Sequence, residues 1–120
     1  MSDLLLPKQG KKKRKPKLKP ISKLQRFARG QQCTLRLPNI CNGNPETVVG
    51  AHVKPQGFGA MGAKPNDLHM VHACSDCHAF IDGGYAVQGW TREQVDSEIF
   101  RALCETQNRV IDEGIKELVA

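Results

Sequence analysis

Cysteines are the residues best suited to chemistry in this sequence, and four of the five fall into two pairs. Cys74 and Cys77 have the C-x2-C spacing that lets two thiolates converge on one tetrahedral ion. Seven residues separate Cys33 from Cys41, but turn-forming residues from Pro38 onward allow the chain to bend back. The spacing predicts one structural zinc ion held by four thiolates, with buried, reduced cysteines as the alternative.

The fifth cysteine, Cys104, lies in a helical pattern and is predicted to be a small core residue. An odd cysteine count and an initial apolar run too short for a signal peptide indicate a reducing compartment, where disulfides are rare. Metal-bound thiolates are therefore favoured over a disulfide framework. Structural zinc contributes about 10–16 kcal/mol to the folding of small peptides, which is comparable with the stability of a whole small domain.

The composition predicts one small domain with a thin core. The chain has 120 residues, of which 39% are hydrophobic and only 5% aromatic. This length excludes multi-domain enzymes and most doubly wound cofactor-binding folds, and a core this thin needs a metal or a disulfide to stabilise it. No apolar run is long enough to span a bilayer.

Positive charge is concentrated at the start of the chain. Residues 1–30 carry eleven basic side chains and one acidic one, a net charge of +10, whereas residues 31–120 have a net charge of −4. We expect residues 1–20 to form a disordered basic tail because they have too little apolar surface to fold. The side chains expected to bind nucleic-acid phosphates are Lys11, Lys12, Lys13, Arg14, Lys15, Lys17 and Lys19. A solubilising tail, an anionic membrane surface and a nuclear-import signal are the alternatives for this composition.

Patterning over residues 21–120 predicts an α+β domain. A short helix capped by Ser22 is followed by a β-branched strand, a long loop rich in glycine and proline, a second strand, a short helix and a long amphipathic helix. The two strands are predicted over 47–53 and 67–72, with the loop over 54–66 between them. The last two helices are predicted over 74–82 and about 91–118. The last helix is expected to pack over the zinc module, with Trp90 as an anchor, or else to form a dimer interface.

Five segments carry a resemblance to a known family: ARGQQC (28–33), CNGNPET (41–47), AHV (51–53), KPNDL (64–68) and ACSDCHAFID (73–82). In their order and spacing they resemble the HNH, or ββα-metal, endonuclease superfamily. More closely, they resemble the YbcO-like nuclease family of phages and prophages. The resemblance implies a small zinc-bound ββα-metal domain of treble-clef-like type with flanking helices.

The resemblance also implies separate roles for several polar residues. His52, at the end of the first strand, is implied as the general base, and His78 as a ligand of a catalytic divalent cation such as Mg²⁺ or Mn²⁺. Asp82 lies four residues after His78, on the same side of a helix, and is expected to be the second protein ligand of that ion. Asp67 is expected to orient His52 or to contact the ion.

Two positions depart from the HNH pattern. Ala51 precedes the base where an acidic or histidine ligand is common, and Asp67 lies seven residues before Cys74, where the pattern places an asparagine about five before. Purely structural roles for His52, His78 and Asp82 are therefore alternatives, with His78 also a further candidate zinc ligand. His69 and His72 have no motif position and are interpreted as structural or surface residues, with His72 as a substitute metal ligand if the register is shifted.

The function predicted from these features is hydrolysis of phosphodiester bonds in DNA, with low sequence specificity, in phage recombination or DNA processing. The place of action implied is the cytoplasm of a bacterial host. The alternatives are a nucleic-acid-binding module that contains zinc and does not cleave, and an accessory protein of a recombination machine.

Overall fold

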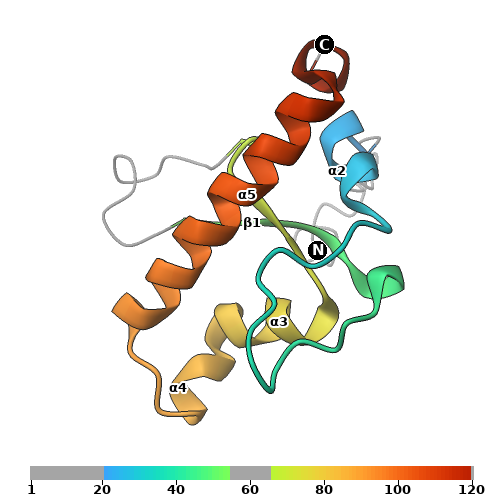
Figure 1. Cartoon of the computed structure of the whole chain (residues 1–120). Coiled ribbons are helices and arrows are strands. Elements are labelled where there is room, and N and C mark those ends of the chain that lie inside the picture. Colours follow the sequence, from blue (N-terminus) through green and yellow to red (C-terminus); the bar gives the residue numbers. More distant parts are fainter. Residues whose placement is uncertain (1–20, 55–65, 120) are drawn as a thin grey trace, which may run out of the picture.

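The computed structural model describes residues 21–54 and 66–119, and the side chains of 115–119 are not described (Figure 1). The elements, in chain order, are α2 (Lys23–Ala28), the 3₁₀ turn η1 (Pro45–Thr47), β1 (Val49–His52), β2 (Met70–Ala73), α3 (Ser75–Ala79), the π-type turn η2 (Phe80–Gly84), α4 (Tyr85–Val87) and α5 (Arg92–Val119). They form a small domain of mixed helix and sheet. No helix within the described ranges is long and apolar enough to cross a membrane.

A two-stranded antiparallel sheet lies at the centre of the domain. β1 and β2 pair in a register that places Val49 opposite Ala73 and His52 opposite Met70. All four residues of β2 are buried because β1 pairs with one edge and α5 packs across the strand. In β1 only Ala51 is buried, which leaves His52 accessible at the end of the strand.

The long helix α5 covers the sheet, as the packing interpretation of the C-terminal helix predicts. Thr91 and Gln94 form a reciprocal capping box at its start, with N–H to side-chain oxygen distances of 2.8 and 3.1 Å. Trp90 packs edge-on against Phe80, with ring centroids 5.0 Å apart. The buried positions along the inner face of the helix are Val95, Ile99, Ala102, Thr106 and Val110.

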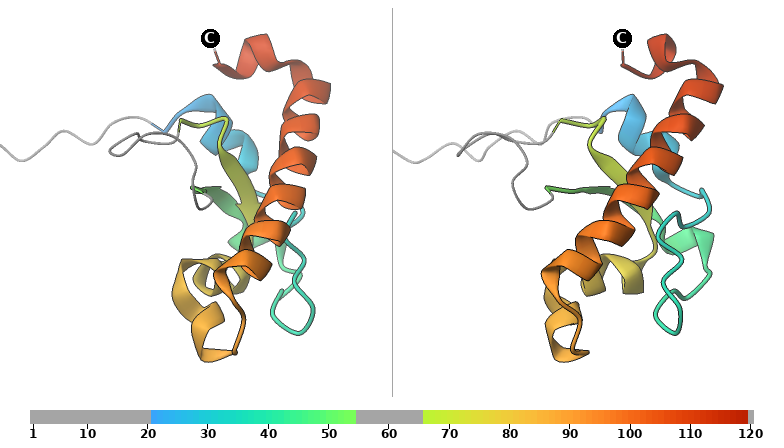
Figure 2. Two further views of the ribbon diagram at one scale, coloured as in Figure 1. Left: turned by 90° about the vertical axis from the view of Figure 1, so that its left-hand side faces the viewer. Right: turned by 60° about the vertical axis from the view of Figure 1, so that its left-hand side comes forward.

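Helix α2 lies beside the sheet and the C-terminal half of α5 (Figure 2). The Ser22 side chain caps it by accepting the N–H of Gln25 at 3.1 Å, as the sequence predicts. Leu24 is buried in a second cluster with Met70 and Val110. The helix is thereby fixed to both β2 and α5.

Two strands differ in extent from the prediction. The first is shorter because Asn44 caps η1, so the chain is helical until Thr47, becomes extended at Val48 and enters the sheet at Val49. The second begins later because the side chain of Asn66 accepts the N–H of Leu68 at 2.8 Å, which makes a turn before β2. Residues 1–20 and most of the predicted loop over 54–66 lie outside the described residues.

One helical prediction is confirmed and another is wrong. The helix predicted over 74–82 is observed as α3 and the first part of η2, and it ends after Asp82 because Gly83 has a φ of 151°. Cys104 is exposed, so its assignment to the core is wrong. Ala102 and Thr106 take the inward positions on that part of α5.

A buried polar network explains why Thr106 faces inward. The Thr106 hydroxyl donates to Thr34 Oγ1 at 3.0 Å, and Thr34 in turn bonds to the backbone of His72. The His72 ring is 1% exposed and lies 2.9 Å from an Arg109 nitrogen through Nδ1. Burial, with the nearby Arg109 charge, lowers the pKa of His72 to about 4. His72 is therefore a neutral structural residue that joins β2 to α5.

Candidate functional site

Four sulfur atoms form a cluster beside the sheet. They all lie within 4.8 Å of one another and belong to Cys33, Cys41, Cys74 and Cys77. The sulfurs of Cys41 and Cys74 are 3.8 Å apart. Four sulfurs placed ~2.3 Å from a tetrahedral zinc ion are about 3.8 Å from one another, so this separation fits the edge of such a site. The cluster can hold a metal ion such as zinc.

Local structure directs the C-x2-C pair toward the cluster. Cys74 is the N-cap of α3, and its sulfur accepts the N–H of Cys77 at 3.4 Å. Cys77 follows in the first turn of the helix, and both residues are fully buried. The end of β2 and the start of α3 therefore fix two of the four sulfurs.

Cys33 and Cys41 reach the sulfurs of Cys74 and Cys77 because the chain between Cys33 and Cys41 turns sharply. Arg36 and Asn39 have positive φ angles of 40° and 63°. The N–H of Cys41 then donates to the carbonyl of Leu37 at 2.9 Å. These turns bring Cys41 back beside Cys33 despite the seven intervening residues.

Hydrogen bonds favour a thiolate at Cys33. Its sulfur accepts the N–H of Arg36 at 3.4 Å and that of Cys74 at 3.5 Å. The pKa of Cys33 is lowered to about 4, chiefly because the Cys77 thiol donates to it, and the pKa of Cys77 is raised by the same contact. Burial raises the pKa of Cys41. The cluster thus supplies N–H donors to sulfur, as metal-bound thiolates require.

An ion pair that the sequence did not predict fixes the cysteine loop to α5. Arg36 forms two hydrogen bonds with Glu105, one of them 2.8 Å long between Nη2 and Oε1. The pKa of the Glu105 carboxyl lies below its usual value, chiefly because Arg36 donates to it. The loop between Cys33 and Cys41 is therefore held from both sides, by the cluster and by α5.

His52 and Asp67 form a direct pair at the other end of the sheet. His52 Nε2 lies 2.7 Å from Asp67 Oδ1, with side-chain exposures of 37% and 29%. The pKa of Asp67 is lowered, first because the Ser22 hydroxyl bonds to it and then because of His52. Ser22 is recognisable from the sequence as a helix cap, but this second contact depends on the fold and has no local signal.

His78 and Asp82 form the second pair. His78 Nε2 lies 3.4 Å from Asp82 Oδ2, and the side chains are 38% and 68% exposed. The four-residue spacing that places both side chains on one side of a regular helix is preserved here, although Asp82 lies in η2. An imidazole nitrogen and a carboxylate oxygen this close and this accessible can together contact one divalent ion.

The two pairs flank β2 along the chain. Asp67 precedes β2 in the turn after Asn66, and His52 is paired with Met70 at the first residue of that strand. His78 follows β2, on α3. The structure therefore forms a strand-end pair and a helix pair, each assembled from residues that the sequence analysis singled out.

Comparison with known proteins gives the relationship. A family model described as "Putative nuclease YbcO" matches residues 22–115, which is most of the chain. The chain belongs to the YbcO family. YbcO proteins of Escherichia coli (strain K12) and Enterobacteria phage 82 are each 43% identical to it, over 62% of this chain and 90% of the relative. A solved structure described as a "putative bacteriophage protein" from Escherichia coli str. K-12 substr. MG1655 has 35% identity and a TM-score of 0.59, over 74% of this chain and 96% of that one.

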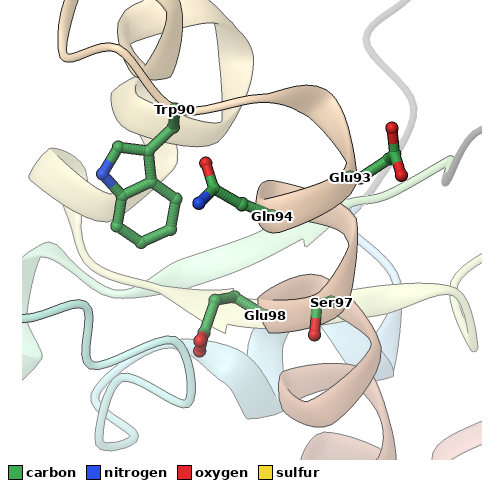
Figure 3. A pocket seen from close by; sticks show the side chains of 5 residues that line it. All are labelled: Trp90, Glu93, Gln94, Ser97 and Glu98. Atoms are coloured by element: carbon green, nitrogen blue, oxygen red, sulfur yellow. The ribbon is translucent and has the colours of Figure 1, made fainter.

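The YbcO match includes every candidate residue described above and leaves out the basic tail. It begins at Ser22, the residue that contacts Asp67. An open hollow of about 410 Å³ at the start of α5 also lies within the match, and Figure 3 shows its lining residues: Trp90, Glu93, Gln94, Ser97 and Glu98. Because two of these side chains are carboxylates, the hollow is unsuited to bind phosphate.

Proposed function

We propose that this protein is a metal-dependent nuclease of the HNH type that hydrolyses phosphodiester bonds in DNA. The observation that carries the proposal is the accessible 2.7 Å contact between His52 and Asp67 at the end of β1. The description of the YbcO family as nucleases and the strand–strand–helix order around His52 and His78 support it.

His52 acts as the general base in this proposal. Asp67 accepts a hydrogen bond from Nε2, so a neutral imidazole holds its proton there and carries the lone pair on Nδ1. Because the lowered pKa of Asp67 keeps that carboxyl ionised, the ring orientation and tautomer are fixed at working pH. Nδ1 can then take a proton from the water that attacks phosphorus.

His78 and Asp82 would hold the catalytic divalent cation, Mg²⁺ or Mn²⁺. Such an ion, when bound, stabilises the negative charge that develops on the phosphate. The contribution of the protein is to place one nitrogen and one oxygen ligand 3.4 Å apart on an exposed helical turn, where a phosphate can approach. Both side chains keep enough exposure to exchange their mutual contact for one with an ion.

The four cysteines would hold structural zinc. This site has no open position for substrate because all four ligands are protein sulfurs. Its role is to fix the 33–41 segment to α3, and hence to fix the helix that carries His78.

DNA is the proposed substrate, with low sequence specificity. The tail lysines and arginine from Lys11 to Lys19 would bind phosphates, which attracts nucleic acid without reading bases. The phage origin of one relative supports a role in phage recombination or DNA processing inside the bacterial cytoplasm.

A plasmid-nicking assay with Mg²⁺ or Mn²⁺ tests the proposal. We expect His52→Ala to lower the nicking rate by about 10²–10⁴, the usual contribution of a general base, and His78→Ala to abolish metal-dependent nicking. Cys104→Ser, a change at an exposed residue outside the cluster, serves as the control and should nick like wild type. Equal nicking by all four proteins would indicate a contaminating nuclease and overturn the proposal.

A non-catalytic nucleic-acid-binding module is the second candidate. Ala51, buried immediately before His52, is the observation that favours it, because many HNH sites have a further metal ligand there. DNA binding by purified wild-type protein without nicking in either metal would favour this candidate.

A further inference from the structure

Helix α2 carries exposed cations that no described acidic residue pairs with. Lys23 and Arg26 lie on the helix and Arg29 is its C-cap; all three are exposed, whereas Leu24 and Ala28 are buried. Among the side chains described, those of residues 21–54 and 66–114, no carboxylate forms an ion pair with any of the three. The outward face of α2 therefore presents charge that is available to a partner.

The other four arginines of the described ranges are already engaged. Their acidic partners lie between 2.5 and 4.0 Å away, in the pairs Arg36–Glu105, Arg92–Asp96, Arg101–Glu98 and Arg109–Glu105. Most of these pairs stabilise α5 or hold other segments against it. Among the arginines, those of α2 are distinguished by the absence of a described acidic partner.

The charged face of α2 lies close to the strand-end pair, His52 and Asp67. Ser22, the cap of α2, bonds to Asp67, which holds His52. Near its other end, α2 contacts β1, where a Cβ built on Gly50 would lie 3.4 Å from the Ala28 Cβ. The helix thus runs along the strand that ends in His52, with Lys23 next in sequence to Ser22.

We infer that the outward face of α2, formed by Lys23, Arg26 and the C-cap residue Arg29, is a docking surface for the DNA backbone beside His52. Charge complementarity selects the occupant, since a row of unpaired cations fits a row of phosphates. The inference rests on the proposed function, because it describes how the substrate reaches the strand-end pair. In this arrangement the helix orients the duplex, and base sequence has little influence.

The end of the molecule opposite α2 provides a control surface at which the same change in net charge can be made. α4 and the start of α5 lie at the opposite end of α5 from α2 (Figure 1), and this end includes the acidic hollow of Figure 3. Ala86, Gln88 and Ser97 are exposed neutral residues there. Changing these three to Glu alters the net charge by the same amount as changing the three α2 cations to Gln.

Binding of the full chain to a short labelled DNA duplex tests the inference. The His52→Ala background is used because it is expected to slow cleavage by about 10²–10⁴, and fluorescence anisotropy is measured over a range of salt concentrations. We expect the variant with Lys23→Gln, Arg26→Gln and Arg29→Gln to bind roughly 10- to 100-fold more weakly at 0.1 M salt. Its slope of log affinity against log salt should fall in magnitude by about 2–3, since each phosphate contact contributes about 0.9.

The control variant and a single substitution complete the design. The variant with Ala86→Glu, Gln88→Glu and Ser97→Glu should keep the wild-type slope, and Arg26→Gln alone should lower the slope magnitude by about 1. An unchanged slope in the α2 variant, or an equal loss in the control variant, would overturn the inference. Circular dichroism checks that each variant remains folded.

Failure of this inference can be told apart from failure of the proposed function. If wild type does not nick DNA but the α2 variant loses binding, the docking surface stands and the nuclease proposal falls. If nicking depends on His52 but binding is insensitive to α2, only the docking surface is contradicted.

Discussion

At the scale of single residues, contacts give the candidate site its character. His52, Asp67, His78 and Asp82 could each be singled out from the sequence through its resemblance to HNH proteins. The Ser22–Asp67 and Arg36–Glu105 contacts could not, because each joins residues that are distant along the chain and has no periodic or motif signal. Residue types could therefore be predicted, whereas the partners that orient them depend on the fold.

Glu105 yields a prediction about pH. Its pKa is lower in the folded protein than its ordinary value, so the pair with Arg36 stabilises the fold above about pH 4.5 and is lost as pH falls through the lowered value. We expect Glu105→Gln to reduce the free energy of unfolding by about 0.5–1 kcal/mol, a modest amount because both side chains are partly exposed.

Urea denaturation of wild type and variant at a fixed free-zinc concentration measures this difference. From about pH 5.5 to about pH 8 the difference should stay constant, since Glu105 remains ionised throughout. A difference that fades between about pH 7 and 5.5 would contradict the assignment of the lowered pKa to Glu105.

At the scale of elements, Gly50 lies where β1 packs against the Met70 side chain of β2 and Ala28 of α2. A Cβ at this position would lie 2.8 Å from the Met70 sulfur and 3.4 Å from the Ala28 Cβ. We expect Gly50→Val to destabilise the protein by about 1–3 kcal/mol through overpacking, as measured by urea denaturation. Val49→Ile, on the exposed position beside it, should change stability little. Equal stability of the two variants would contradict overpacking and show that the Met70 side chain moves aside.

Elements with strong local signals could be predicted, and those set by tertiary contacts could not. The cap formed by Ser22 is where the sequence places it, because capping depends on neighbouring backbone groups. Cys104 illustrates the limit. The apolar stripe predicts that Cys104 lies in a helix. In the structure Thr106 takes a buried position on α5, where it bonds to Thr34, and Cys104 is exposed to solvent.

At the scale of the whole molecule, the positive charge is separated from most of the folded domain. The positive excess lies in residues 1–30, which end just after α2, while the remainder of the chain is mildly acidic. α2 is thus the place where the basic segment joins the folded domain, beside the strand-end pair. The sequence predicts the charge imbalance, but only the fold places α2 next to His52.

The central structural claim is that four thiolates from two distant segments hold one zinc ion, which fixes the helix of the candidate site. Elemental analysis of purified protein, with zinc counted per chain, tests this claim most directly. We predict one zinc per chain for wild type and for Cys104→Ser, and far less for Cys33→Ser and Cys74→Ser, with loss of folded structure. A wild-type protein that is folded without bound metal, or a Cys74→Ser variant that keeps its full zinc content, would contradict the claim.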